Sequence, residues 1–297
     1  MSASHLEPTK SQPVARLANI RVAVRRLGRI WGGGIPSAAA RQFAALWPIW
    51  VGGIILAVSC AIALDTSSVE WARGVPSWVT VFFRWLTDFG KSGWLLIPGG
   101  VLCLVLLFSD WTVIPRRIAA AWTEIGLLCG FAFVSIAGSG IITNIIKQVV
   151  GRGRPVVFDS SGAFSLLPLQ FDYAQASFPS GHSTTVGALA VVIAVIVPRV
   201  KWPAFLICGL IASSRVFVSA HYPSDVVTGF LLGAAFTWYY AISLSLAGTA
   251  FLRSADGTIR ARAVAIRRLL RKPGGFSIGM GCLWLAVFGV GLTLPTS

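Results

Sequence analysis

The sequence predicts an all-α protein, a polytopic bundle of transmembrane helices. Of its 297 residues, 55% are hydrophobic and only 12% are charged, and the mean hydropathy is +0.76. A soluble domain usually carries about 25% charged residues, so this chain has too few charges to cover a water-facing surface. Apolar runs also recur along the chain, and a bilayer core needs about 20 such residues per helix. These observations exclude a soluble enzyme, a disordered chain and a secreted disulfide scaffold.

Seven apolar runs are the predicted spans. They are 46–64, 93–110, 122–146, 183–199, 202–218, 224–248 and 276–294. The first six form a predicted domain over 46–248, and the last is an additional transmembrane helix within 276–297. The five cysteines lie inside apolar runs without a CxxC pair, so we expect small buried side chains with neither disulfides nor a metal site.

The first 45 residues form a basic tail in which no cleavable signal peptide is expected. Residues 14–31 place apolar side chains near one helical face and arginines elsewhere, a pattern typical of an amphipathic helix on an anionic membrane surface. A cleaved organellar transit peptide is the competing interpretation.

The net charge of +15 is interpreted as a signal of topology and not of nucleic-acid binding. Of the 25 Lys and Arg residues, 18 lie in the tail, in the loops at 116–117 and 199–201, and in the basic segment 249–275. This distribution predicts a cytoplasmic N-terminus and an outward C-terminus. Within the basic segment, 258–272 is predicted to be a cytoplasmic interfacial helix.

Four of the other seven cations lie at the outward ends of the third and fifth predicted spans, beside two of the three histidines. They are Lys147, Arg152, Arg154 and Arg215. Pairing with lipid headgroups would explain one or two of them, whereas four together suggest an anionic ligand.

The first of three polar segments runs from Lys147 to Pro155. Gly151 and Gly153 allow the chain to turn, so that Arg154 can point back toward Lys147. A lysine point charge and an arginine fork together suit a phosphate group.

The second segment is Pro179–His182. Ser180 is a natural N-cap, and Gly181 lets an anion approach the backbone N–H groups at the start of a helix. His182 in the first turn could protonate a leaving oxygen. A plain Ser-capped helix with an interfacial histidine is the alternative.

The third segment runs from Ser214 to Asp225. Asp225 follows His221 by four residues, close enough to accept a hydrogen bond from one ring nitrogen and leave the other as a nucleophile. The alternative is that Asp225 is only a helix N-terminal charge favoured by the dipole.

Together, Lys-x6-Arg-Pro, Pro-Ser-Gly-His and Ser-Arg-x5-His-x3-Asp resemble the three signature motifs of the type 2 phosphatidic acid phosphatase (PAP2) superfamily. The resemblance covers about 46–248 and matches at each defining position. It implies a six-helix core, with the seventh span outside it. The matched residues are Lys147, Arg154, Pro155, Pro179, Ser180, Gly181, His182, Ser214, Arg215, His221 and Asp225.

The resemblance implies a role for each site residue. His221 would form a phosphohistidine, Asp225 would orient it, and His182 would protonate the leaving group. Lys147, Arg154, Ser180, Gly181 and Arg215 would bind the phosphate. No metal or other cofactor would be needed, and Arg152, outside the motif, is left as a headgroup contact.

The expected activity is hydrolysis of a lipid phosphate at the outer face of a cytoplasmic-type membrane. A phosphatidate or phosphatidylglycerol phosphate is the first expectation, then a polyprenyl diphosphate or lipid A phosphate. A lipid phosphotransferase and a non-catalytic phospholipid-binding or transport protein are the other classes. The apolar loop 156–178 is expected either to dip into the outer leaflet or to rest on it.

Overall fold

The computed structural model describes residues 21, 25, 28, 34–254 and 258–288. Its main helices are α2 (Ile35–Ala44), α3 (Trp47–Ala63), α4 (Asp65–Arg73), α5 (Ser77–Thr87), α6 (Gly93–Phe108), α7 (Arg116–Val150), α8 (Phe158–Ser161), α9 (Gly181–Ile196), α10 (Lys201–Phe217), α11 (Pro223–Leu246), α12 (Val264–Leu270) and α13 (Gly275–Phe288). Strands β1 (Phe251–Arg253) and β2 (Ile259–Ala261) pair as an antiparallel hairpin. Helices therefore dominate, as the composition predicts.

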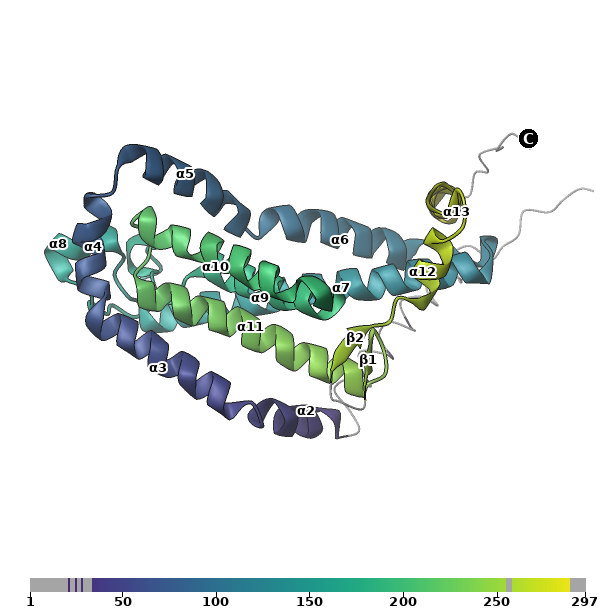
Figure 1. Cartoon of the computed structure of the whole chain (residues 1–297), viewed down its shortest axis with the longest axis horizontal. Coiled ribbons are helices and arrows are strands. Elements are labelled where there is room, and N and C mark those ends of the chain that lie inside the picture. Colours follow the sequence, from purple (N-terminus) through teal and green to yellow (C-terminus); the bar gives the residue numbers. More distant parts are fainter. Residues whose placement is uncertain (1–20, 22–24, 26–27, 29–33, 255–257, 289–297) are drawn as a thin grey trace, which may run out of the picture.

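The long helices run side by side along one axis, with α9 at the centre (Figure 1). This helix packs against α7, α10 and α11, and ten of its sixteen residues are buried. Two apolar clusters, one on each side of α9, form the core of the bundle. The helix with the second polar segment at its start is therefore enclosed by the others.

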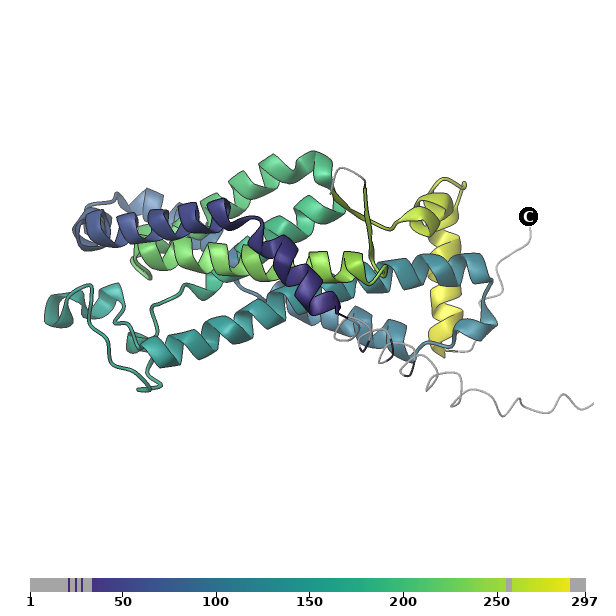
Figure 2. The ribbon, with the colours of Figure 1, turned by 90° about the horizontal axis from the view of Figure 1, so that it is seen from below.

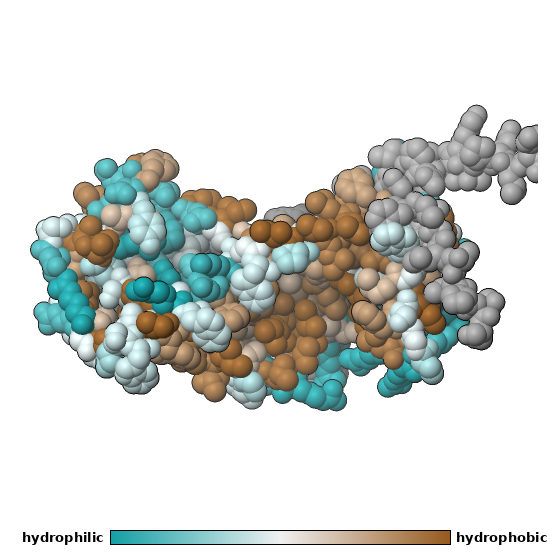
Figure 3. Space-filling view, turned by 90° about the horizontal axis from the view of Figure 1, so that it is seen from above, coloured by the Kyte–Doolittle hydropathy of each residue, from teal (hydrophilic) through white to brown (hydrophobic). Residues whose placement is uncertain are grey.

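The outer surface is apolar enough for lipid. Four helices or helix pairs, Ser77–Phe108, Arg116–Val150, Pro198–Phe217 and Pro223–Leu246, are long and apolar enough to cross a membrane, and α2 with α3, bent by 61°, makes up to five. Large apolar side chains are exposed along α3 and α6. Figure 3 shows apolar residues over the middle of one face and polar residues gathered at the end that carries α4 and α8. The chain is an integral membrane protein.

Two predicted spans differ in extent from the prediction. The second is preceded by α5, which continues it to a total of 32 residues. The seventh corresponds to α13, which lies across the bundle and not along it (Figures 1 and 2). The indole of Trp122 on α7 donates to the carbonyl of Gly279 on α13 at 3.0 Å. That α13 crosses a bilayer remains a prediction.

The basic segment 249–275 is not one interfacial helix. Residues 259–261 form β2, and only Val264–Leu270 are helical. The prediction of a helix over 258–272 is wrong for its first part, because 259–261 pair with 251–253 and the backbone is satisfied by the hairpin. The amphipathic helix predicted for 14–31 lies almost wholly outside the described residues.

Close packing of α9 against α11 depends on glycine. A Cβ added to Gly233 would lie 2.0 Å from the carbonyl oxygen of Thr184. One added to Gly187 would lie 2.2 Å from that of Phe230. Small residues let helix backbones approach closely within a membrane. The approach brings the starts of α9 and α11 together, and these carry the second and third polar segments.

We expect Gly233→Ala to destabilise the bundle by about 1–3 kcal/mol, the usual cost of overpacking a close-packed contact. The thermal unfolding midpoint of the detergent-purified protein measures the effect. Gly209→Ala in α10 is the matched control, because its added Cβ would meet no atom within 4 Å. Equal midpoints for the two variants would show that the crossing can relax.

Candidate active site

The three polar segments meet at one end of the bundle. The C-terminal ends of α7 and α10 and the N-terminal ends of α9 and α11 converge there, opposite the β1–β2 hairpin (Figures 1 and 2). Segments separated by up to 78 positions in the chain therefore share one polar region, as their positions at the ends of predicted spans imply.

The turn after α7 is made by Gly151. Its φ of 59° is left-handed, and an added Cβ would lie 1.9 Å from the carbonyl oxygen of Leu167. The N–H of Gly151 closes the helix on the carbonyl of Lys147 at 2.9 Å. Only glycine combines this conformation with so close a contact, so the sequence ends α7 just beyond Lys147.

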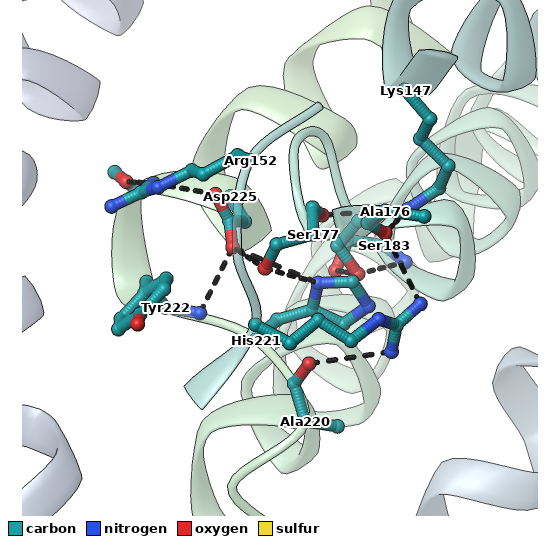
Figure 4. Close-up of polar contacts among 12 residues, drawn as sticks. Lys147, Arg152, Ala176, Ser177, Ser183, Ala220, His221, Tyr222 and Asp225 are labelled. Atoms are coloured by element: carbon teal, nitrogen blue, oxygen red, sulfur yellow. Dashed lines mark hydrogen bonds and ion pairs between the residues drawn. The ribbon is translucent and has the colours of Figure 1, made fainter. Parts of the chain in front are cut away.

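Lys147 and Arg154 converge on one carbonyl group. The Lys147 Nζ donates to Ala176 O at 2.6 Å (Figure 4), and Arg154 Nη2 donates to the same oxygen at 3.1 Å. The Arg154 guanidinium also stacks 3.8 Å from the centroid of the Tyr173 ring. Burial lowers the pKa of Arg154, and the phenol of Tyr173 and the carboxylate of Asp225 oppose that shift. Two cations thus converge as the phosphate hypothesis requires.

The start of α9 is capped as predicted. The Ser180 hydroxyl oxygen accepts from the Ser183 N–H at 3.4 Å and from the Ser183 hydroxyl at 2.9 Å. The first intrahelical bond runs from Thr184 N to Ser180 O. The amides of Gly181 and His182 precede it and, as at any helix start, have no intrahelical acceptor. Such N–H groups bind anions.

A cavity of about 520 Å³ opens beside His182. It lies between the start of α6, the C-terminal half of α7 and the first turn of α9, with Lys91 and Asn144 among its polar lining residues. Its other walls include Leu96, Ile136 and Ile141. The polar end of an amphiphilic molecule can therefore reach His182 while its apolar part lies against α6 and α7.

His221 is buried and linked to Asp225 through a hydroxyl group. The Nδ1 of His221 lies 3.7 Å from Asp225 Oδ2, beyond hydrogen-bond distance. The Ser177 Oγ lies between them, 2.5 Å from that carboxylate oxygen and 3.4 Å from Nδ1 (Figure 4). If Ser177 donates to Asp225, it accepts from Nδ1–H, which leaves Nε2 without a proton. The expected direct His–Asp hydrogen bond is thus replaced by a bridged one.

Burial lowers the pKa of His221 to about 3, with Lys147 and Arg154 acting in the same direction and Asp225 opposing them. The imidazole is therefore neutral at physiological pH. A neutral ring with a free Nε2 is the nucleophilic form of histidine.

Asp225 also stabilises the helix that carries it. Its Oδ2 accepts from the backbone N–H of Tyr222 at 3.1 Å, at the start of α11. The two interpretations of this carboxylate, helix-terminal charge and partner of His221, therefore both describe the structure.

Arg215 reaches the site from the last turn of α10. Its Nη1 donates to the Thr87 hydroxyl at 3.0 Å, and its buried Nε has no hydrogen-bond partner among the described residues. An unpaired buried donor is costly, so this guanidinium is ready to bind a further acceptor.

Two residues at the site were not predicted to act there, and a third has a different role from the predicted one. Arg152 is 5% exposed and binds Asp225, so its prediction as a headgroup contact is wrong. Asp65 binds the other side of Arg152; an acidic residue directly after the first apolar run was the available signal. Ser177 stands in an apolar loop with no distinguishing pattern.

Comparison with known proteins gives the family. A model of the PAP2 superfamily matches residues 128–248. The lipid A 1-phosphatase of Rhizobium johnstonii is 36% identical over 192 residues, which cover 63% of this chain and 76% of that protein. The chain belongs to the PAP2 superfamily.

Other PAP2 relatives differ in the substrates they are named for. The undecaprenyl-diphosphatase of Sulfolobus acidocaldarius is 30% identical, over 59% of this chain and 74% of that protein. The decaprenylphosphoryl-5-phosphoribose phosphatase of Mycolicibacterium smegmatis is 41% identical, over 59% and 79%. A PAP2 phosphatidylglycerolphosphate phosphatase structure from Bacillus subtilis aligns at 21% identity over 71% of this chain and 94% of that one, with a TM-score of 0.44.

Proposed function

We propose that this PAP2 protein is a lipid phosphatase that works through a phosphohistidine at His221. The observation that carries the proposal is the state of His221: it is buried, its Nδ1 faces a Ser177–Asp225 bridge, and the cations Lys147 and Arg154 lie around it. Phosphoryl transfer needs a nucleophile that is oriented by a second group and lies beside positively charged side chains.

The proposed reaction uses these positions. The Nε2 of His221 attacks phosphorus, the P–N bond forms, and the P–O bond to the lipid breaks as His182 gives a proton to the leaving oxygen. Water then attacks phosphorus and the P–N bond breaks, which releases phosphate and free His221. His182 takes the proton of that water and is restored for the next cycle.

The phosphate oxygens need donors throughout. We assign them to Lys147, to Arg154, to Arg215 and to the N–H groups at the start of α9, next to Ser180 and Gly181. Charge on these oxygens is the main quantity to be stabilised in phosphoryl transfer. In the described ranges no three His, Cys, Asp or Glu side chains group as metal ligands. The proposed mechanism assigns the positive charge at the phosphate to the Lys and Arg side chains.

We infer that the site faces outward and that the N-terminus is cytoplasmic, because 18 of the 25 cations fall in the N-terminal tail, the loops at 116–117 and 199–201 and the basic segment 249–275, which the positive-inside rule assigns to the cytoplasm. The lipid reaches the site from the bilayer. Supporting this route, the cavity beside His182 opens against apolar walls, and the loop 156–178 exposes Phe164, Leu169 and Phe171.

The similarity to lipid A 1-phosphatases over 76% of their length moves a phosphorylated glycolipid ahead of phosphatidate as the expected substrate. The purified protein should be tested in detergent micelles with lipid A 1-phosphate, undecaprenyl diphosphate, phosphatidylglycerol phosphate and phosphatidate, with release of inorganic phosphate as the measurement. We expect the highest kcat/KM with lipid A 1-phosphate. If folded protein released no phosphate from any of these lipids, the proposal would be wrong, and release that required a second lipid acceptor would indicate a phosphotransferase.

Chelation tests the absence of a metal from the mechanism. We expect EDTA to change kcat by less than about twofold, because protein cations and not a Lewis acid stabilise the phosphate charge. The assay should be run with and without added Mg²⁺ or Zn²⁺. Loss of activity on chelation that is restored by a divalent cation would contradict the metal-free mechanism.

A further inference from the structure

Behind His221 lies a buried group of charges that the signature motifs do not include. We call Asp65, Arg152 and Asp225 the charge triad. The Nη1 of Arg152 lies 2.6 Å from Asp225 Oδ1, and its Nη2 lies 2.8 Å from Asp65 Oδ2. Figure 4 shows Arg152 next to Asp225, with Ser177 and His221 beyond that carboxylate.

Arg152 is fully engaged with protein atoms. Besides the two carboxylates it donates to the hydroxyl of Ser224 at 2.8 Å and, from Nε and Nη2, to the carbonyl of Ala163 at 3.0 and 2.8 Å. It binds the Asp225 oxygen opposite the one that faces Ser177 and His221. A guanidinium with this set of partners has no donor left for a substrate phosphate.

Asp65 brings a charge from a distant part of the chain. It is the first residue of α4, is fully buried, and accepts from the backbone N–H and the hydroxyl of Ser224 at 3.0 and 2.5 Å. Ser224 immediately precedes Asp225 in the first turn of α11. Asp65 therefore fixes both Arg152 and the start of the helix that carries Asp225.

The balance of charge in the triad bears on catalysis. Two carboxylates and one guanidinium leave a net charge of −1. If Arg152 met Asp225 alone, the pair would be neutral and would stabilise little positive charge on the imidazole. With Asp65 present, one negative charge remains beside His221, whose ring becomes positive as Nε2 bonds to phosphorus. At low dielectric such a charge acts strongly.

We propose that Asp65 and Arg152 are positioning residues of this phosphatase site. Arg152 holds the Asp225 carboxylate in the orientation that Ser177 and His221 require, and Asp65 keeps the charge triad negative. The inference rests on the proposed function, because it requires His221 to be the nucleophile.

The first test is a split between kcat and KM. We expect Asp65→Asn, which preserves shape, to lower kcat about 10- to 100-fold, the usual effect of a group that orients a reacting side chain at one remove. KM should change less than about threefold, because the phosphate-binding groups are untouched. Arg73→Gln is the matched control, because Arg73 lies on the same helix α4 as Asp65 but its ion pair with Asp159 on α8 is exposed.

The second test uses the pH dependence of kcat/KM. The ionisable groups facing His221 are Asp225 on α11, Lys147 on α7 and Arg154 in the following loop, and none of them is changed. Asp65→Asn makes the charge triad neutral, so the pKa of His221 should fall and the acidic limb should move to lower pH. Arg152→Gln makes the triad more negative, so the limb should move to higher pH.

The double variant Asp65→Asn/Arg152→Gln restores a net charge of −1. Its acidic limb should return toward that of wild type, while kcat stays low because Asp225 has lost its anchor. Titration of the substrate phosphate is common to all four proteins and cancels in the comparison. Circular dichroism and gel-filtration profiles identify variants that fold.

Each outcome bears on one claim. The inference would be overturned if the acidic limb of the kcat/KM profile moved in the same direction in both single variants. It would also be overturned if folded Asp65→Asn kept a kcat within about twofold of wild type. A raised KM with unchanged kcat for Arg152→Gln would overturn it too, by making Arg152 a phosphate ligand. If His221→Ala kept full activity, the proposed function would fail separately, whatever Asp65→Asn did.

Discussion

His221→Ala is expected to reduce phosphate release by at least about 10⁴-fold, because removal of a covalent nucleophile leaves only binding and electrostatic contributions. The imidazole is 3% exposed and bridged through Ser177 to Asp225. In His221→Ala no other group at this position could activate a water molecule in place of the imidazole. The measurement is kcat with the best lipid of the panel, in detergent micelles, under single-turnover and steady-state conditions.

His5→Ala is the matched control for the loss of a histidine, because His5 lies outside the predicted phosphatase domain. It should retain wild-type kcat. With His221 present, acid-labile and base-stable phosphate should be trapped on the protein when the reaction is quenched in alkali, as expected of phosphohistidine. Full hydrolysis by folded His221→Ala would assign the nucleophile to another group.

His182→Asn is expected to lower kcat by about 10²–10⁴-fold toward lipids with a poor leaving group, the range of general acid catalysis. The side chain stands in the first turn of α9 and borders the cavity beside α6 and α7. Gly90 packs against it: a Cβ there would lie 3.0 Å from the imidazole Cδ2. Its ring is thus held at the wall of that cavity.

The leaving group distinguishes acid catalysis from loss of structure. When the substrate is a phosphate ester of an acidic phenol, the phenolate leaves without being protonated. His182→Asn should therefore hydrolyse such an ester at nearly the wild-type rate. The same substrate should remain unreactive with His221→Ala, because the nucleophile is still missing. An equal loss of kcat toward both kinds of ester would show that His182 binds or positions the phosphate instead.

Local features of the sequence were sufficient to predict much of the fold and the proposed site. Over the described residues each apolar run corresponds to a helix, and the C-terminal end of α7 and the start of α9 follow from Gly151 and from the Ser180 cap. The positions of the three polar segments at the ends of predicted spans indicated which helix ends would meet. The hairpin at 251–261 was missed, because three-residue strands in a basic segment carry no periodic signal.

Contacts between distant residues could not be predicted in the same way. Ser177 reaches Asp225 only because the 151–180 loop folds back, with Ser177 N–H bonded to Arg152 O at 3.0 Å. Asp65 meets Arg152 across 87 positions of sequence. Ser177 has no distinguishing local pattern, and the position of Asp65 after the first apolar run does not indicate which residue it will contact.

The sequence by itself determined that this is a helical membrane protein with cations and two histidines at one end, because hydropathy and charge act residue by residue along the chain. Only the tertiary structure decided the environment of those histidines. Burial, the bridge through Ser177 and the charges of Asp65 and Arg152 depend on distances between segments. The strength of electrostatic interactions depends on such distances and on the local dielectric constant. Neither quantity can be obtained from the separation of residues along the sequence.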